Sequence, residues 1–472
     1  MRGKLFSNLL VAFLSQGISL VLSVLMSFIL PKMFGVNQYS YSQLFIFYIG
    51  YVGFFHFGIN DGLYLRLGGQ KYERLNHRSI GAEFRFFLLF EIIIAFIICG
   101  LGLVLFKDHN RQIVILLAAI YLVINNLALC LGYIFQAVNE TKWFSYSVMI
   151  DRIIVIVSIV VLLITKQTTY VPFIVLYTCS RLISLMFCIW KGRKIVFSKW
   201  LPLSKTLREL WNDASIGIKL TISNIVALLI LGVGRMIVDN IWGVESFGKI
   251  SLAFSLTNFF LVFIQQVSMV MFPALRQIEK HKQIDIFIFL RSGVNTLAPA
   301  ILVFYIPLQF VLGLWLPEYS ESLVYLAYLL PICIFDGKMQ MIFTTYFKVL
   351  RQEKRLMFIN IISLIFSSIS CFICGYILGS MTAVVASMVI AIIFRSILSD
   401  HLLSKSFGQK IGREILYEIV LILSYIVIVS NLSGIMAFLA TLGLYVIYLL
   451  LNYKEVKILI ENIKSRKVLK ET

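Results

Sequence analysis

Residues 86–106 read FFLLFEIIIAFIICGLGLVLF, a run in which Glu91 is the only charged side chain. A helix needs about 20 such residues to cross the hydrocarbon core of a bilayer. The whole chain has this character, because 60% of its 472 residues are apolar and only 14% are charged. A soluble protein of this size needs more polar surface. The sequence therefore predicts an all-α, polytopic membrane protein and excludes the soluble, disulfide-rich secreted and disordered classes.

Apolar runs of about 20 residues or more predict fourteen transmembrane helices. They lie at 7–30, 41–60, 86–106, 112–136, 144–165, 170–190, 214–238, 246–271, 286–315, 321–346, 356–378, 381–400, 414–430 and 434–451. If the N-terminus is cytoplasmic, the cytoplasmic segments hold 31 of the 42 Lys and Arg residues and the outer segments hold 4. This asymmetry predicts that both termini are cytoplasmic. It also accounts for the net charge of +19 without a nucleic-acid partner.

Two short similarities indicate an internal repeat. FGVNQYSYS (34–42) resembles WGVESFGKI (242–250), and QAVNETK (136–142) resembles KVLRQEK (348–354). Two copies of a six-helix unit would insert with the same polarity, which predicts two parallel six-helix lobes and is typical of alternating-access transporters. The predicted divisions are an N-terminal lobe (1–195), a basic cytoplasmic linker (196–213), a C-terminal lobe (214–405) and a final helix pair with a basic tail (406–472).

Several cations lie inside the predicted spans, where a charge is costly unless it faces a polar interior. The strongest candidates for a cationic lumen are Arg152, Arg181, Lys219 and Lys338. Arg235 is a weaker candidate, because Asp239 follows one turn later and could pair with it. Lys249 and Arg395 are expected to reach the membrane interface from the ends of their helices. For each lumen candidate, the alternative is a buried ion pair that holds helices together.

Three acids, Glu91, Asp336 and Asp239, are either counter-charges or carboxylates that bind a coupling H⁺ or Na⁺. No other cofactor is expected, because the sequence has no nucleotide-binding P-loop, and Cys371 and Cys374 have no accompanying His or second Cys pair that would complete a metal site. The outer loops are about ten residues or shorter by this assignment, too short for a catalytic domain. We therefore expect a protein that is not an enzyme and has no catalytic residue.

The stretches PKMFGVNQYSYSQLF (31–45) and GINDGLYLRLGGQKYERL (58–75) resemble the opening of the Wzx-type oligosaccharide flippases. These belong to the multidrug/oligosaccharidyl-lipid/polysaccharide exporter superfamily. The resemblance implies a flippase that carries an undecaprenyl-diphosphate-linked oligosaccharide from the cytoplasmic to the outer leaflet, for surface polysaccharide biosynthesis. It also implies alternating access through a cation-lined central cavity. The implied location is the bacterial cytoplasmic (inner) membrane, and the implied partners are membrane lipids, a polysaccharide polymerase and other assembly proteins.

Within that expectation, the span cations would donate charge-assisted hydrogen bonds to the diphosphate. Asn125, Asn126 and Ser223 would meet sugar hydroxyls. The alternative is an ion-coupled drug or metabolite exporter similar to the MATE transporters, which share the fold. The excess of cations over acids inside the spans favours an anionic cargo.

Overall fold

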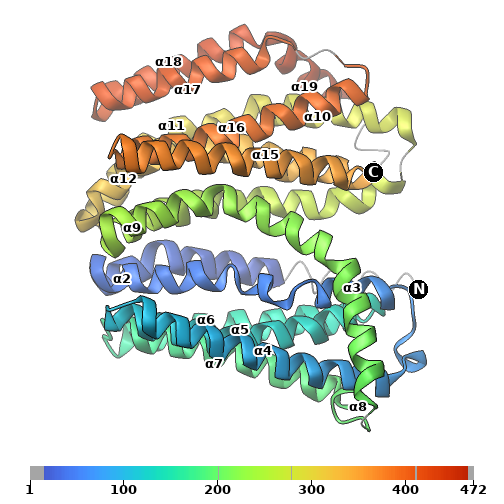
Figure 1. The fold of residues 1–472 in the computed structure, drawn as a ribbon. Helices are drawn as coiled ribbons and strands as arrows, with labels where there is room; N and C mark the ends of the chain where they lie inside the picture. Colours follow the sequence, from blue (N-terminus) through green and yellow to red (C-terminus); the bar gives the residue numbers. More distant parts are fainter. Residues whose placement is uncertain (1–14, 200, 278, 410–411, 466–472) are drawn as a thin grey trace. The chain divides into compact units, whose positions relative to one another are not determined.

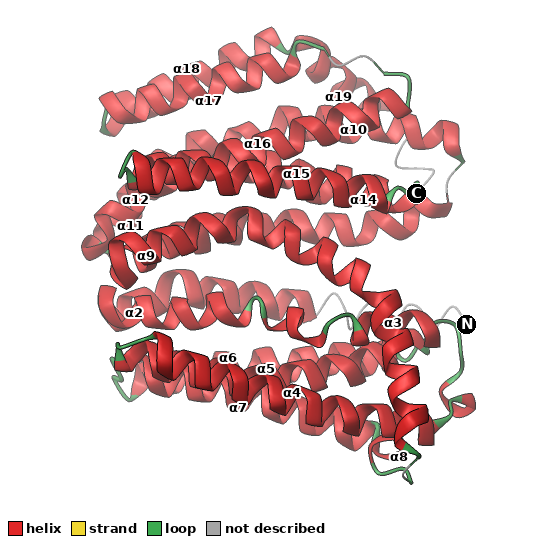
Figure 2. Cartoon of the chain, viewed as in Figure 1, coloured by secondary structure: helices red, strands yellow, loops and turns green. Residues whose placement is uncertain are grey.

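The computed structural model describes residues 15–199, 201–277, 279–409 and 412–465. Within these ranges the chain is helical throughout, with short loops and no strand (Figure 2). The predicted all-α fold is confirmed. The first part of the predicted span 7–30, residues 7–14, lies outside the described residues.

The chain divides into two compact units, Met1–Ile225 and Val226–Thr472. The helices that begin in the first unit are α2 (Leu30–Ile49), α3 (Ile59–Leu67), α4 (His77–Leu105), α5 (His109–Ala137), α6 (Thr141–Ile164), α7 (Tyr170–Lys191), α8 (Arg193–Val196) and α9 (Leu203–Gln277), as labelled in Figure 1. Those of the second unit are α10 (Lys280–Leu297), α11 (Ile301–Trp315), α12 (Ser320–Leu329), α13 (Pro331–Lys338), α14 (Thr344–Val349), α15 (Glu353–Phe372), α16 (Met381–Ser406), α17 (Glu414–Asn431), α18 (Gly434–Leu451) and α19 (Tyr453–Ser465).

Eleven described segments are long and apolar enough to cross a membrane, or twelve when the bent pair Pro317–Leu329 and Pro331–Val349 is taken as one span. Two of the eleven, Ser15–His56 and Lys205–Val262, contain a glycine with non-helical backbone, Gly35 and Gly243 respectively. Dividing each of these two segments at its glycine turns twelve spans into fourteen. That number and the approximate positions agree with the spans expected from the apolar runs.

Gly35 and Gly243 occupy matching places in the two sequence repeats. Their backbone angles are nearly the same, with φ 67° and ψ 174° at Gly35 and φ 82° and ψ 178° at Gly243. This conformation is essentially restricted to glycine, because a side chain would clash with the backbone. The repeated motif therefore marks the break between two helices in each half of the chain.

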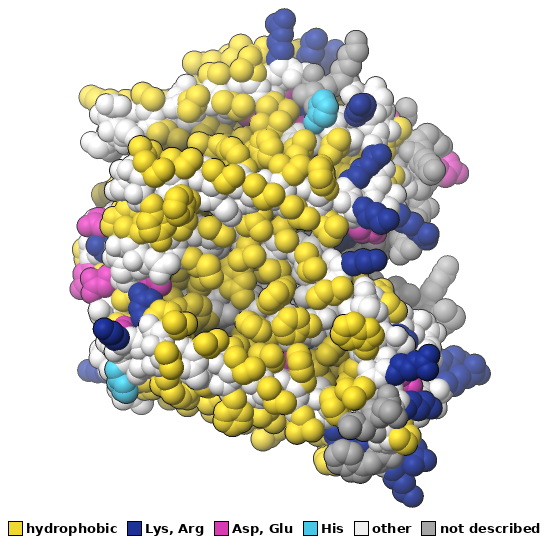
Figure 3. Space-filling model, in the orientation of Figure 1, with side chains coloured by type: hydrophobic (Ala, Val, Ile, Leu, Met, Phe, Trp, Pro, Cys, Tyr) yellow, Lys and Arg dark blue, Asp and Glu magenta, His cyan; other side chains and the backbone are white. Residues whose placement is uncertain are grey.

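Each unit has its own apolar core. Phe84, Phe87, Leu131, Ile134 and Phe135 are buried in the first unit, at the contacts of α4 with α5. The core of the second unit includes, among its buried residues, Phe287, Ile342, Phe343, Tyr346 and Phe347. Apolar side chains also cover much of the outer surface (Figure 3), as expected for helices that face lipid.

The first part of α9 packs directly on α3 within the first unit. A Cβ on Gly62 would lie 1.9 Å from the carbonyl oxygen of Asp213, and one on Gly217 would lie 2.0 Å from that of Gly58. The backbones approach so closely that only glycine fits at these positions. Residues 203–213, at the end of the predicted linker, are helical and form the start of α9. The predicted domain boundaries stay a prediction.

Candidate functional site

Arg181 on α7 is the centre of a buried polar group in the first unit. Its side chain is 8% exposed, and its Nη1 lies 3.7 Å from Oδ2 of Asp151 on α6. Its Nε donates a hydrogen bond of 3.0 Å to Oδ1 of Asn125 on α5. Ser180 donates a further hydrogen bond of 2.8 Å to Asp151. Arg181 therefore ties three helices together through a buried ion pair, the alternative that the sequence left open.

The polar group around Arg181 continues from Asn125 through Asn126 to the buried carboxyl of Glu91. Asn125 donates from Nδ2 to Oδ1 of Asn126 at 3.4 Å. Asn126 donates from Nδ2 to Oε2 of Glu91 on α4, at 3.0 Å, and to the carbonyl oxygen of Val52. Asn60 donates to the carbonyl oxygen of Asn126 at 3.1 Å. Glu91 and Asn126 are both fully buried. Among the described residues, Oε1 of Glu91 has no hydrogen-bond partner and no cation lies within 4.0 Å of the carboxylate.

Arg152 lies next to Asp151 in sequence but takes no part in its ion pair. Its Nη1 is 3.5 Å from the hydroxyl oxygen of Tyr177, and its Nε is buried with no partner among the described residues. No described carboxylate lies within the 4.0 Å that would make an ion pair with Arg152. This guanidinium group therefore has donors that no described carboxylate engages.

The second unit repeats the arrangement around Arg395 on α16. Nε of Arg395 donates to Oδ1 of Asn360 on α15 at 2.9 Å, and Nη1 lies 3.4 Å from Oδ1 of Asp336 on α13. Gln340 donates to the other oxygen of Asp336 at 2.5 Å. The expectation that Arg395 reaches the interface is wrong, because α16 continues to Ser406 and leaves Arg395 buried in the helix interior.

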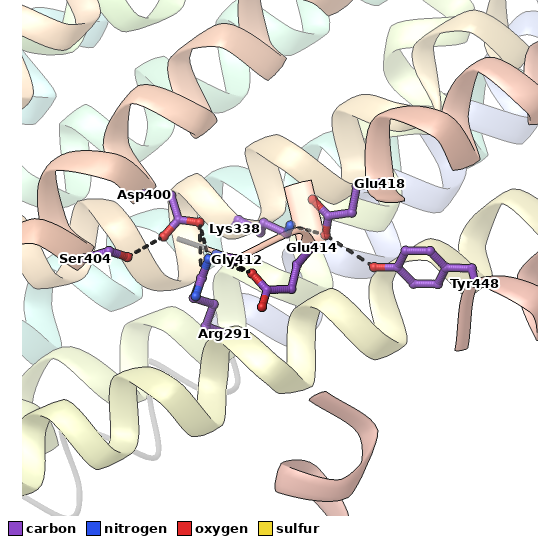
Figure 4. A network of polar contacts seen from close by, with 8 residues as sticks. All are labelled: Arg291, Lys338, Asp400, Ser404, Gly412, Glu414, Glu418 and Tyr448. Atoms are coloured by element: carbon purple, nitrogen blue, oxygen red, sulfur yellow. Dashed lines mark hydrogen bonds and ion pairs between the residues drawn. The ribbon is translucent and has the colours of Figure 1, made fainter. Parts of the chain in front are cut away.

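Lys338 also lies in a buried ion pair, at the centre of Figure 4. Its ammonium group contacts Oε1 of Glu418 on α17, and the hydroxyl of Tyr448 on α18 is 3.5 Å from the same oxygen. This pair attaches α17 to α13. Glu418 lies within the predicted span 414–430 but was not among the predicted site residues, although a carboxylate inside a span indicates a buried cation nearby.

A second ion pair in Figure 4 joins Arg291 on α10 to α16 and α17. Two nitrogens of Arg291, Nε and Nη2, donate to Oδ2 of Asp400 at 3.1 and 3.0 Å, and Nη2 lies 3.5 Å from Glu414. Ser404 donates to the other oxygen of Asp400 at 3.0 Å. Arg291 was not among the predicted site residues, because it lies near the start of the predicted span 286–315 and was counted with the cytoplasmic basic residues.

The remaining predicted site residues lie on α9. Lys219 is exposed and Ser223 is half-buried, and no described carboxylate lies within 4.0 Å of the ammonium group of Lys219. Arg235 donates to Oγ of Ser251 at 2.8 Å and lies over the rings of Phe247 and Phe254, 5.0 and 5.3 Å from their centroids. Asp239 is 9% exposed. Lys249, expected to reach the interface, pairs at 2.8 Å with the exposed Glu321.

The motif 58–75 holds one more polar cluster, around Arg66 on α3. Arg66 contacts Glu83 and lies 2.9 Å from Asp213 on α9. Burial lowers the pKa of Arg66, but the two carboxylates outweigh burial and raise the pKa above its ordinary value. Asp61 of the same motif accepts a hydrogen bond of 2.5 Å from Thr221. These contacts hold α3 to α9, a role that the motif alone did not reveal.

The comparisons with known proteins rest on structure, since no protein-family model and no curated protein matches the sequence. The lipid II flippase MurJ, in an inward closed conformation, is 16% identical with a TM-score of 0.62, over 96% of this chain and 99% of that chain. An inward-facing multidrug resistance MATE transporter of the MOP superfamily is 13% identical with a TM-score of 0.60, over 82% and 94%. A mutant of the Vibrio cholerae MATE transporter VcmN is 14% identical with a TM-score of 0.54, over 88% and 98%.

The chain has the fold of these transporters. The likeness covers both units, and it agrees with the predicted pair of six-helix lobes followed by a helix pair. Among the described residues, no group of three or more His, Cys, Asp or Glu side chains is placed to hold a metal ion. The structure thus presents a polytopic membrane protein in which Arg181, Arg291, Lys338 and Arg395 lie in buried ion pairs, whereas Arg152 and Lys219 lie outside any described ion pair.

Proposed function

We propose that the chain is a flippase that moves an undecaprenyl-diphosphate-linked oligosaccharide from the cytoplasmic to the outer leaflet by alternating access. The observation that carries the proposal is the extent of the structural likeness. MurJ matches 96% of this chain, whereas the two MATE transporters match nearly their whole length but only 82% and 88% of this chain. The larger share of this chain that MurJ covers supports a flippase layout over a MATE layout.

The physical task of such a flippase is to carry a charged head group across hydrocarbon. A diphosphate cannot cross about 30 Å of hydrocarbon unaided, because its desolvation is too costly. In the proposal, Arg152 and Lys219 bind the diphosphate, since neither is paired with a described carboxylate. Asn125 and Arg181 are then structural, because each satisfies the other. Lys338 and Asn126 are likewise engaged by Glu418 and Glu91.

The test is a flipping assay in proteoliposomes that contain a prenyl-diphosphate-linked oligosaccharide. Transport would be followed as the fraction of sugar that becomes accessible to a membrane-impermeant glycosidase. We expect Arg152→Gln and Lys219→Gln each to slow flipping about tenfold or more, since each removes a charge-assisted contact with the diphosphate. Lys249→Gln is the matched control, because it removes one positive charge from an exposed ion pair.

Two outcomes would contradict the proposal. Unchanged flipping by both variants would remove the assigned diphosphate contacts. Export of a cationic dye by wild-type protein that does not move the lipid-linked sugar would favour the MATE-like exporter instead. Thermal unfolding of each variant in the same detergent separates a lost contact from a lost fold.

The energy source that we propose is an ion gradient, with Glu91 as the group that binds the coupling proton. Glu91 is the buried carboxyl of the first unit without a described cation beside it, whereas Asp336 is paired with Arg395. A carboxyl of this kind can exchange a proton when the surrounding helices move.

A further inference from the structure

An aromatic and basic cluster lies where α6 begins and α7 ends. Two ammonium groups lie over the indole ring of Trp143, with Nζ of Lys191 3.9 Å and Nζ of Lys142 4.6 Å from the ring centroid. Nζ of Lys191 is also 3.9 Å from the ring centroid of Trp190 and 6.0 Å from that of Phe187. We call these five residues the Trp143 cluster. Cation–π attraction holds the two ammonium groups at one place on the surface.

The cluster concentrates positive charge. Because the ammonium groups of Lys142 and Lys191 lie 4.6 and 3.9 Å from the centroid of the same ring, they are at most about 8.5 Å apart. Their separation is shorter than the Debye length of about 10 Å at 0.1 M salt, so the two charges repel each other. Segments 139–143 and 190–194 also contain Arg193 and Lys194, against Glu140 as their single carboxylate. Glu140 lies 3.7 Å from Lys142, which leaves a local excess of positive charge.

The aromatic part of the cluster favours a lipid as the source of an anion that these ammonium groups could bind. Both α6 and α7 are apolar and long enough to span a membrane, so their ends lie near the lipid head groups. Tryptophan favours this interface, and the Trp190 side chain is 58% exposed there. Lys and Arg side chains gather near α8, next to an apolar surface (Figure 3). Basic residues beside a membrane span attract anionic lipids.

We propose that the Trp143 cluster binds the phosphate of an anionic phospholipid, such as phosphatidylglycerol, from the adjoining leaflet. The ammonium groups of Lys142 and Lys191 both donate to the phosphate, and the exposed indole of Trp190 packs against the glycerol and upper acyl chain. The aromatic rings hold the ammonium groups in place before the lipid arrives, which lowers the entropic cost of binding. This site does not depend on the cargo of the transporter and stands whether or not the chain is a flippase.

Native mass spectrometry of the full-length protein in detergent tests the proposal. Phosphatidylglycerol and phosphatidylcholine with the same acyl chains would be titrated at equal concentration, and the ratio of their first binding constants measured. Wild-type protein should prefer phosphatidylglycerol. The Lys142→Gln/Lys191→Gln variant should lose about 30-fold of that preference, from the usual contribution of two basic side chains. The Lys142→Arg/Lys191→Arg variant should keep the preference.

The matched control is Lys107→Gln/Lys166→Gln, which removes two exposed lysines beyond the opposite ends of α4 and α6 and should keep the preference. An unchanged preference in the Lys142→Gln/Lys191→Gln variant would overturn the proposal, as would equal binding of both lipids by wild type. Displacement of phosphatidylglycerol by millimolar inorganic phosphate would also overturn it, because the site would then accept any soluble phosphate. The wild-type lipid ratio needs no variant, so the proposal stays testable if a substitution impairs folding.

Discussion

The Lys338–Glu418 ion pair is enclosed on all sides, with 5% and 1% of these residues exposed. Substitution Lys338→Met should lower the free energy of unfolding by about 3–5 kcal/mol, because it leaves the Glu418 carboxylate buried without a cation. The double variant Lys338→Met/Glu418→Leu should recover most of the loss, since it removes both charges and fills the space with apolar atoms. Unfolding in detergent, followed by circular dichroism, measures both variants. A double variant as unstable as the single one would show that the pair is not the cause.

Glu91 tests the proposed coupling at a single residue. A Glu91→Gln variant keeps an amide oxygen to accept the hydrogen bond from Asn126, so we expect its stability to stay close to that of the wild type. It cannot bind the coupling proton, and flipping should therefore no longer respond to an imposed pH gradient. The measurement is flipping in proteoliposomes with and without that gradient. Glu321→Gln, at a carboxylate that is 63% exposed, is the control and should keep the response. A variant at Glu91 that still responds would exclude this residue as the coupling site.

At this scale, sequence could show which buried charges are costly but not how each is neutralised. Arg181 and Lys338 were predicted to line a lumen, and both are in buried ion pairs. The partner of Lys338 is 80 residues away, and that of Arg291 is 109 residues away. Such pairings depend on which helices become neighbours, and the spacing along one helix does not contain that information.

A substitution at Gly243, where α9 breaks, tests how much the backbone conformation of the break alone contributes to stability. A Gly243→Ala variant should lower the free energy of unfolding by about 1–3 kcal/mol, since Ala is strained at φ 82°. A Cβ at Gly243 would meet nothing within 4 Å, so crowding cannot explain a loss. Gly313 also has open space around it but lies within α11, and Gly313→Ala should be neutral or stabilising. Equal effects of the two substitutions would show that the break does not require glycine.

Sequence predicts the membrane helices well because their signal is local. Each span requires about 20 apolar residues in a row, and these can be counted without knowledge of their neighbours. The ends of helices are harder to predict, because polar residues can continue a helix beyond the bilayer. α16 extends to Ser406 beyond the predicted end at residue 400, and α9 begins at Leu203, well before the predicted span 214–238. The first of these differences moved Arg395 from a helix end to a helix interior.

At the scale of the whole molecule, each half buries one arginine between an Asn and an Asp, but the helices that carry the Asn and the Asp are exchanged between the halves. Arg181 lies on α7 and Arg395 on α16, which are the sixth predicted spans of their halves. Each arginine donates from Nε to the side-chain oxygen of an Asn, and each has Nη1 near an Asp carboxylate. In the first half the Asn is on α5 and the Asp on α6. In the second half the Asp is on α13 and the Asn on α15, so the acid and the amide have changed places. The sequence repeat could not show this exchange, because the two short matching stretches, 34–42 with 242–250 and 136–142 with 348–354, contain none of these Asn, Asp and Arg residues.

This exchange predicts which substitutions the first half tolerates. Asp151→Asn alone should lower the free energy of unfolding by about 3–5 kcal/mol, because Arg181 is left buried without a carboxylate. The double variant Asn125→Asp/Asp151→Asn returns a carboxylate to Arg181 in the order that the second half already uses around Arg395. It should therefore regain most of the lost stability. Thermal unfolding of wild type, both single variants and the double variant gives the coupling energy.

Asn125→Asp alone is the internal control of this cycle. It places a second carboxylate beside Arg181 while Asp151 is still present, so we expect no gain in the free energy of unfolding over wild type. If the double variant is no more stable than Asp151→Asn, the two arginine clusters are not interchangeable, and their similar geometry reflects only the shared helix packing. If the double variant regains stability and flips at the wild-type rate, the two arginine clusters stabilise helix packing within each half and do not contact the cargo. Diphosphate binding would then depend on Arg152 and Lys219, the two of the four strongest lumen candidates that no described carboxylate neutralises.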